Sequence, residues 1–232
     1  MKARAPLDRL PGWLQRYILD FEAQIERAVV DFSRTLASGA RVLDAGAGEC
    51  QYAEHFRTVR YTAVDLGIGD QTWQYGRLDA VGDLLALPFA DGTFDAALNI
   101  VTLEHVTDPA RVVEELYRCL KPGGRLLLIT PLEWEEHQQP HDYFRYTRFG
   151  LEHLTKRAGF ADVRVQAVGG FFRLLSRRLM NSVQFFPGAL AIFPVLFLGP
   201  LALTLPLIDG LDKRRDFTLG HICTARKPET AI

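Results

Sequence analysis

Hydrophobic and polar positions follow a helical period from Trp13 to Leu36 and change to a mixed pattern after Ala40. In the first segment apolar side chains recur every three or four residues, at Leu14, Tyr17, Ile18, Phe21, Ile25, Val29, Phe32 and Leu36. This spacing predicts one amphipathic helix, which Ser38-Gly39 ends. We expect this helix to pack on the core, and a lid over a pocket is the alternative.

Beyond Ala40, short apolar runs alternate with helical segments. The runs predict seven strands, at Arg41–Ala45, Tyr61–Asp65, Arg77–Gly82, Phe94–Val101, Arg125–Pro131, Asp162–Val168 and Phe217–Lys227. Helices are predicted near Tyr52–Thr58, from Pro109 to Leu120 after an Asp108 cap, and up to Ala158 after a Thr147 cap. This alternation predicts an α/β fold with a Rossmann-like, seven-stranded, mostly parallel sheet and helices on both faces. Ligands of such sheets bind at the carboxyl ends of the strands.

Composition narrows the class of protein. The chain has 232 residues, 48% of them hydrophobic, and a net charge of −1, which favours a large folded domain and disfavours a broad nucleic-acid surface. Its three cysteines are odd in number and widely spaced, so we expect reduced thiols in the cytoplasm, no disulfide framework and no metal site. The first residues lack an apolar core segment, so no signal peptide is expected.

A glycine-rich turn follows the first predicted strand, in the sequence VLDAGAGEC from Val42 to Cys50. Gly46 and Gly48 allow a tight turn and a close approach of the backbone to a ligand. The third glycine of a dinucleotide fingerprint would fall at Gln51, and Asp44 would repel a pyrophosphate. Asp44 suits a cofactor that carries an ammonium group.

Asp65 ends the second predicted strand. A carboxylate at this position can accept hydrogen bonds from both hydroxyls of a ribose, and an ordinary turn cap is the alternative. The glycine-rich turn before it favours the ribose role.

Several segments together resemble the class I S-adenosylmethionine-dependent methyltransferases, in particular those that act on small molecules. They are DAGAGEC, VDLG, GDLLALPFADGTFDAALNIVTLEHVTDP and LKPGGRLLLITP, and the resemblance covers roughly Val42 to Phe160. The run PHDYFRYT, from Pro140 to Thr147, and the helix after it are similar to a bacterial subset of this group. The chain departs from the pattern at Cys50, where many members have glycine.

The resemblance implies S-adenosylmethionine as the cofactor and gives nine residues a place around it. Asp44, Ala45, Gly46 and Gly48 would surround its methionine part, Asp65 its ribose, Leu66, Asp83 and Leu84 its adenine, and Asn99 would line it at the end of the fourth strand. Without the resemblance, the residue pattern itself supports cofactor-binding roles for Gly46, Gly48 and Asp65. Asp83 could equally be an ordinary turn residue.

Candidate catalytic residues follow the fourth and fifth predicted strands. Methyl transfer depends mainly on positioning, and some acceptors also need a base, for which histidine is suited. We predict His141, Tyr143 and His105 as these candidates. The alternative is structural, with His105 bracing its turn beside Glu104 and the aromatic side chains of PHDYFRYT packing under the sheet. A carboxylate acceptor would need no base.

The stretch Leu179–Ile208 contains no charged residue. Its length matches a membrane helix of about 20 residues, but repeated prolines and a final strand that rejoins the sheet argue against a single span. A hairpin that lies on or dips into a membrane remains, with arms of about 12 residues reaching about 18 Å. The basic residues that flank it suit anionic headgroups: Arg173, Arg177, Arg178, Lys213, Arg214 and Arg215. An apolar cover for the sheet or a dimer interface is equally compatible.

These patterns predict an N-terminal helical segment over residues 1–39, a methyltransferase core over 40–170 and 211–232, and an apolar insertion over 171–210. The expected function is methyl transfer to a small molecule, including an apolar or lipid-linked one, without nucleic acid. A nucleotide-cofactor oxidoreductase and a non-catalytic, membrane-associated binding module are the alternatives. The expected location is cytoplasmic, with peripheral contact at the inner face of the membrane as a further possibility.

Overall fold

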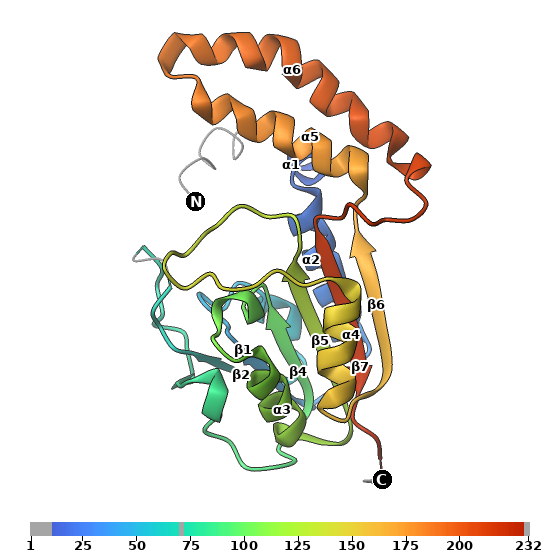
Figure 1. Cartoon of the computed structure of the whole chain (residues 1–232). Helices are drawn as coiled ribbons and strands as arrows, with labels where there is room; N and C mark the ends of the chain where they lie inside the picture. The colour runs from blue at the N-terminus through green and yellow to red at the C-terminus, as the bar shows by residue number, and fades with distance from the viewer. Residues whose placement is uncertain (1–10, 70–71, 230–232) are drawn as a thin grey trace. The chain divides into compact units, whose positions relative to one another are not determined.

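The computed structural model describes residues 11–69 and 72–229. Within these residues seven strands form one sheet in the order β3-β2-β1-β4-β5-β7-β6 (Figure 1). Their bounds are β1 Arg41–Ala45, β2 Arg60–Asp65, β3 Ala80–Val81, β4 Phe94–Ile100, β5 Leu120–Pro131, β6 Ala161–Val168 and β7 Gly220–Arg226. Strands β1 to β5 pair in parallel, whereas β7 runs in the opposite direction. The predicted mostly parallel α/β fold is therefore confirmed.

The strand order reverses beside β1, and this reversal positions the candidate site. β1 pairs with β2 on one side and β4 on the other, so Asp44 lies between Ala63 and Leu98. The chain passes outward from β1 to β3 and then returns to β4 and β5. The loops after β1 and β4 consequently lie side by side at the carboxyl ends, where parallel sheets bind their ligands.

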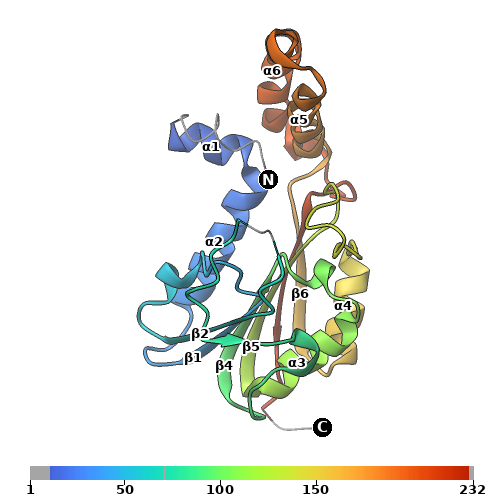
Figure 2. The ribbon, with the colours of Figure 1, turned by 90° about the vertical axis from the view of Figure 1, so that its left-hand side faces the viewer.

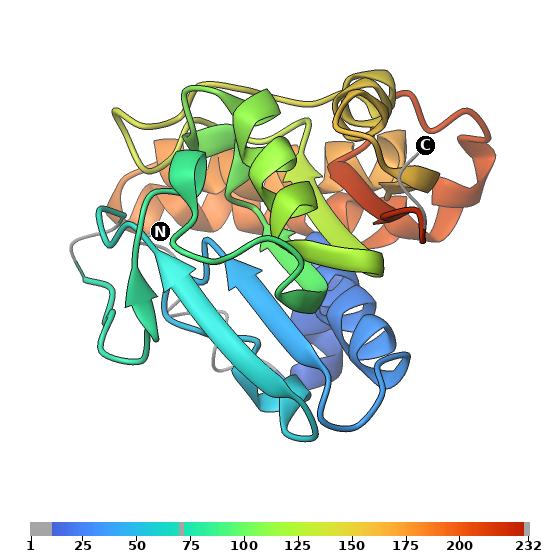
Figure 3. The same ribbon diagram turned by 90° about the horizontal axis from the view of Figure 1, so that it is seen from below.

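Helices cover both faces of the sheet (Figure 2), whose strands twist strongly when seen from below (Figure 3). On one face are α3, Pro109–Cys119, and α4, Arg148–Arg157. Both begin at the predicted caps, because the side chain of Asp108 accepts from the amide of Arg111 and that of Thr147 accepts from the amide of Gly150. These caps satisfy amides that have no partner inside the helix.

The predicted single helix from Trp13 to Leu36 is wrong in one respect, since the structure has two helices. They are α1, Gly12–Ile18, and α2, Asp20–Arg34, and Leu19 between them leaves the helical region with φ −94° and ψ 53°. Asp20 and Glu22 lie in the first turn of α2, where the helix dipole favours negative charge. The apolar pattern runs across the break, which is why periodicity alone did not reveal it. The helix predicted near Tyr52–Thr58 is only a short 3-10 turn, η2, at Ala53–Phe56.

The described residues divide into two compact units. One contains residues 26–69, 72–166 and 221–229, and the other contains residues 11–25 and 167–220. The division falls inside α2 and inside β6. The domain boundaries proposed from the sequence stay a prediction.

The second unit is helical, and it holds most of the apolar insertion. Helix α5, Phe171–Ser182, packs against a helical run from Gly188 to Leu211, which consists of η6 Gly188–Ala191, α6 Ile192–Thr204 and η7 Leu205–Leu211 (Figure 1). Pro194 and Pro206 lie in first turns, where a missing amide costs no helical hydrogen bond. Pro200 is inside α6, yet the helix continues through it. The prolines therefore interrupt the segment less than the sequence suggested.

Two ion pairs join α5 to the start of α2 within this unit. Arg173 lies 3.0 Å from Asp20, and Arg177 lies 3.3 Å from Glu22. The buried carboxylate of Asp209 in η7 accepts from the amide of Arg173 at 3.0 Å. Basic residues that flank the uncharged stretch are thus held by acids of their own unit.

In the sheet-bearing unit, a buried carboxylate on α3 holds the loop that carries Asp83. Glu115 is only 2% exposed and accepts from the amide of Leu87 at 2.9 Å, as well as from Arg111 and Arg118. Hydrogen bonds from Arg118 are the main reason that the pKa of Glu115 lies below its usual range. Arg118 also donates to the carbonyl of Leu87 at 3.0 Å, so both polar groups of that peptide unit are fixed.

We expect Glu115→Ala to lower the free energy of unfolding by about 2–4 kcal/mol, because it leaves the Leu87 amide unsatisfied and removes the partner of two arginines. Urea denaturation followed by circular dichroism measures this change. Glu114→Ala on the same helix is the matched control, since its carboxylate is 40% exposed and its ion pairs are long at 3.7 and 3.9 Å. The control should cost less than about 1 kcal/mol; equal losses for the two variants would contradict the assignment.

Candidate active site

The loop after β1 turns through two glycines with left-handed backbone conformations, Gly46 at φ 84° and Gly48 at φ 52°. The amides of Gly46 and Ala47 donate to the carbonyl of Val64 in β2, at 2.8 and 3.1 Å. A side chain at Gly46 would also collide with Thr102, because an added Cβ would lie 2.2 Å from its Cγ2. The close packing of Gly46 against the loop after β4 therefore requires glycine at this position, whether or not a ligand also approaches it.

Asp65 joins the loops after β1 and β2. One carboxylate oxygen accepts from the amide of Gly48 at 2.9 Å, and the other accepts from the amide of Gly67 at 2.8 Å. Each oxygen retains a lone pair for a further donor. The arrangement fits a ribose whose two hydroxyls meet the two oxygens, while Asp65 also serves as the structural tie between the loops.

Asp44 is almost fully buried and accepts a hydrogen bond from the hydroxyl of Tyr61. Burial raises its pKa to about 6, the hydrogen bond from Tyr61 opposes that shift, and the nearby carboxylate of Asp65 adds to it. A cation bound beside Asp44 would favour its charged form, whereas a pyrophosphate would not. Tyr61 carried no sequence signal for this role, because the contact comes from the register of β1 and β2.

The end of β4 closes the glycine loop from the other side. Asn99 is fully buried and donates to the carbonyl of Ala45 at 2.8 Å. Its Oδ1 has no hydrogen-bond partner among the described residues. Thr102 donates to the carbonyl of Gly46 at 3.1 Å. Ala45 and Asn99 thus contribute to the loop through backbone and amide groups.

The residues predicted for the adenine differ in exposure. Leu66 is 43% exposed, so its side chain is available to a ring. Leu84 is 5% exposed and belongs to the hydrophobic core. Asp83 accepts from the amide of Leu85 at 2.9 Å as the cap of the 3-10 turn η3, Leu84–Ala86. Their roles at the adenine stay predictions.

Two aromatic residues beside the glycine loop were missed by sequence reasoning. The ring of Trp73 would be 3.2 Å from a Cβ added at Gly48, and the hydroxyl of Tyr75 accepts from the amide of Gly69 at 2.8 Å. The two rings meet edge to face at 6.2 Å between centroids. They lie beside the glycines of the loops after β1 and β2, and only the density of aromatic residues in QTWQY could have drawn attention to them.

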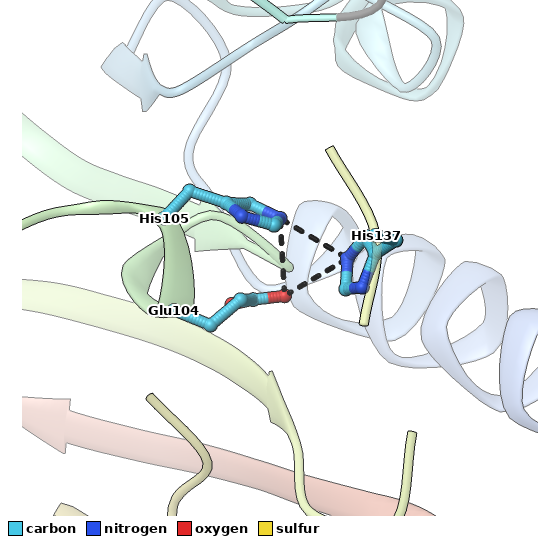
Figure 4. Close-up of side chains that lie close together, drawn as sticks. All are labelled: Glu104, His105 and His137. Carbon is cyan, nitrogen blue, oxygen red and sulfur yellow. Dashed lines mark hydrogen bonds and ion pairs between the residues drawn. The ribbon is translucent and has the colours of Figure 1, made fainter. Parts of the chain in front are cut away.

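After β4 and β5, three side chains converge: Glu104, His105 and His137 (Figure 4). The Nε2 atoms of the two histidines are 3.1 Å apart, and each lies 3.8 Å from one oxygen of Glu104. Burial raises the pKa of Glu104 to about 8 and lowers the pKa of His105 to about 4. His105 is consequently neutral at neutral pH.

The run PHDYFRYT is fixed largely by its backbone. The ring of His105 donates to the carbonyl of His141 at 2.6 Å, and the amide of Tyr143 donates to the carbonyl of Glu104 at 2.8 Å. The side chains of His141 and Tyr143 meet each other at 3.1 Å. The structure therefore brings the three predicted catalytic residues into one cluster of loops at the carboxyl ends of β4 and β5.

Asp142 and Arg145 clamp the same run. Burial acts to raise the pKa of Asp142, but hydrogen bonds from Arg145 and the amide of His137 outweigh it and lower that pKa to about 2. Arg145 reaches both carboxylate oxygens, at 2.6 and 2.7 Å, and donates to the carbonyl of Glu135 at 3.0 Å. The buried Tyr146 donates to the carbonyl of Leu103 at 2.8 Å. These side chains hold the loop, while Tyr143 and Phe144 are exposed and His141 is partly exposed.

Residues 43–128 match a family model described as a methyltransferase domain. Malonyl-(acyl-carrier protein) O-methyltransferase of Erwinia billingiae (strain Eb661) is 33% identical over 102 residues, which make up 41% of this chain and 41% of that protein. Ubiquinone biosynthesis O-methyltransferase of Xylella fastidiosa (strain M23) is 38% identical over 110 residues, which make up 42% of this chain and 44% of that protein. The chain thus spans less than half the length of these curated relatives.

A solved structure shares the fold over a longer stretch. Phosphoethanolamine N-methyltransferase 2 of Haemonchus contortus, in complex with S-adenosyl-L-methionine, superposes with a TM-score of 0.58 at 19% identity, over 88% of this chain and 52% of that chain. The superposition shows a shared fold, and together with the domain match it supports a class I S-adenosylmethionine-dependent methyltransferase domain that includes residues 43–128. Its cofactor is S-adenosylmethionine.

We expect Asp65→Ala to weaken binding of S-adenosylhomocysteine at least tenfold, since it removes both the predicted ribose acceptor and the tie between Gly48 and Gly67. Isothermal titration calorimetry gives the affinity, and thermal unfolding of the free protein separates a structural loss from a binding loss. Asp65→Asn keeps one acceptor oxygen and should fall between the parent and the alanine variant. Unchanged affinity in Asp65→Ala would refute the ribose role.

Proposed function

We propose that this protein is an S-adenosylmethionine-dependent methyltransferase that acts on a small-molecule acceptor. The observation that carries the proposal is the Asp65 carboxylate, which ties the loops after β1 and β2 beside the point where the strand order reverses. The buried acid Asp44 at the same loop suits the ammonium of the cofactor and disfavours a pyrophosphate.

The bound cofactor supplies a methyl group that is already activated on a sulfonium, so the protein's task is to bind, orient and exclude water. His141 and Tyr143 are hydrogen-bonded to each other and carried on a clamped loop, which suits them to position an acceptor. His141 would also accept a proton where the acceptor loses one. His105 is the third catalytic candidate that the sequence predicts.

Calorimetry of the full chain with S-adenosylhomocysteine and, separately, with NAD distinguishes the proposal from an oxidoreductase. We expect binding of S-adenosylhomocysteine in the micromolar range or tighter and no heat with NAD. Binding of NAD alone would reverse the assignment. A non-catalytic module is disfavoured because the chain has all the residues expected to bind the cofactor at these positions: Asp44, Gly46, Gly48, Asp65 and Asp83. If the protein did not bind S-adenosylhomocysteine, the non-catalytic module would be favoured instead.

For the acceptor, an apolar or lipid-linked molecule has the best support. Two relatives are named for a malonyl-(acyl-carrier protein) substrate and for ubiquinone biosynthesis. Independently, the helical run Gly188–Leu211 is 24 residues long, and it contains an 18-residue window with a mean hydropathy of 2.2, of which only 17% is buried. Large side chains such as Phe197 and Leu207 are about three-quarters exposed. An apolar surface of this kind marks an interaction site.

We infer that this surface rests on the cytoplasmic face of a membrane. The strands before and after the hairpin, β6 and β7, are neighbours in one sheet, so the segment departs and returns on the same side and a single crossing is excluded. Three of the flanking basic residues are occupied: Arg173 and Arg177 pair with acids of α2, and Arg215 pairs with Asp209. Attachment should therefore depend more on apolar burial than on anionic lipid.

Vesicle flotation tests this surface. The full chain should float with phosphatidylcholine vesicles and gain little from added phosphatidylglycerol. Phe197→Asp combined with Leu207→Asp should abolish flotation, because both side chains would carry a charge into the lipid. Val81→Asp is the matched control, since Val81 is 72% exposed in the other unit and should not alter flotation. Equal recovery of the parent and the double variant would remove the membrane from the proposal.

A further inference from the structure

The cluster of Glu104, His105 and His137 has an arrangement that methyl transfer from a sulfonium does not require. Three potential ligand atoms face one point: the Nε2 atoms of the two histidines and one carboxylate oxygen of Glu104 (Figure 4). Glu104 and His105 follow β4, whereas His137 comes from the loop between β5 and α4. The fold thus brings His137 to the adjacent pair Glu104 and His105.

The outward-facing nitrogens fix the tautomers of both rings. Nδ1 of His105 lies 2.6 Å from the carbonyl oxygen of His141, and Nδ1 of His137 lies 3.1 Å from the carbonyl oxygen of Glu135. A carbonyl oxygen can only accept, so each Nδ1 carries the proton. In its neutral form such a ring presents a lone pair at Nε2. With both rings in that form, two lone pairs face each other at 3.1 Å.

The carboxylate of Glu104 is equally unsatisfied. Its side chain is fully buried, and neither oxygen has a hydrogen-bond partner among the described residues. A buried acid without a partner is costly, as are two opposed lone pairs. One cation placed between the three ligand atoms would satisfy all of them at once.

The separations fit a single metal ion. Ligand atoms about 2.0–2.2 Å from a tetrahedral ion lie roughly 3.3–3.6 Å from one another. Here the separations are 3.1 Å between the nitrogens and 3.8 Å from each nitrogen to the Glu104 oxygen. Small shifts of two rings and one carboxylate would equalise them.

The surroundings are also those of a metal site. Metal-binding histidines commonly donate their other ring N–H to a carbonyl or carboxylate, which orients the ring. Both rings do so here, and the carboxylate of Asp142 lies 3.5 Å from Nδ1 of His137 and 3.8 Å from Nδ1 of His105. Arg145 and the amide of His137 fix Asp142 in turn.

We propose that Glu104, His105 and His137 bind a divalent transition-metal ion, with Zn²⁺ as the best fit. Two imidazole nitrogens and one carboxylate oxygen form a ligand set suited to zinc, and three protein ligands leave a fourth position open. Mg²⁺ and Ca²⁺, which require mainly oxygen ligands, do not match this set. The proposal gives His105 a metal-binding role in place of proton transfer, and it holds whether or not the chain transfers methyl groups.

Isothermal titration calorimetry of the full chain, stripped with a chelator, tests the site with Zn²⁺ alone and with Mg²⁺ and Ca²⁺ as comparisons. We expect one Zn²⁺ per chain with micromolar affinity or tighter, and no comparable binding of the other ions. His137→Ala and Glu104→Gln should each weaken Zn²⁺ binding at least tenfold. His153→Ala, an exposed histidine on α4, should leave it unchanged.

A measurement on the parent protein keeps the test independent of how the variants fold. In the NMR spectrum of the imidazole nitrogens, Zn²⁺ should shift the Nε2 signals of two of the six histidines, and only those. Absence of stoichiometric Zn²⁺ binding, shifts at other histidines, or an equal loss in His153→Ala would each overturn the proposal.

Discussion

The Asp65 carboxylate is the interaction on which the candidate site depends. Its two oxygens accept from amides in two different loops, so the glycine turn after β1 cannot be positioned without the end of β2. The parallel register of these strands brings the acid there, and the strand order reverses beside β1, where such sheets bind their ligands. One side chain thereby fixes two loops at the carboxyl ends of the strands.

Sequence patterns revealed what is local. All seven strands were predicted, and so were the helix caps Asp108 and Thr147. Both kinds of feature depend on only a few consecutive residues. The break at Leu19 escaped because α1 and α2 share one apolar period. The contact of Tyr61 with Asp44 and the approach of His137 to Glu104 escaped for another reason, since both join residues that only the tertiary fold brings together.

Several residues of the PHDYFRYT run have a structural role. Asp142, Arg145 and Tyr146 hold it in place through buried or clamped polar contacts, and its backbone at His141 and Tyr143 is fastened to the turn after β4. Hydrogen bonds therefore join the loops after β4 and β5 directly. Such supporting contacts are what positions the side chains of a functional site.

The ion pairs of Arg173 with Asp20 and of Arg177 with Glu22 make the apolar hairpin and the start of α2 interdependent. A chain without the hairpin would lack the arginines that pair with Asp20 and Glu22. A chain without its first helices would lack the acids that pair with Arg173 and Arg177. Homologous proteins should consequently have both the hairpin and the acidic start of α2, or neither. In a homologue that has lost one of them, we expect the other to be lost as well or its charged residues to be replaced.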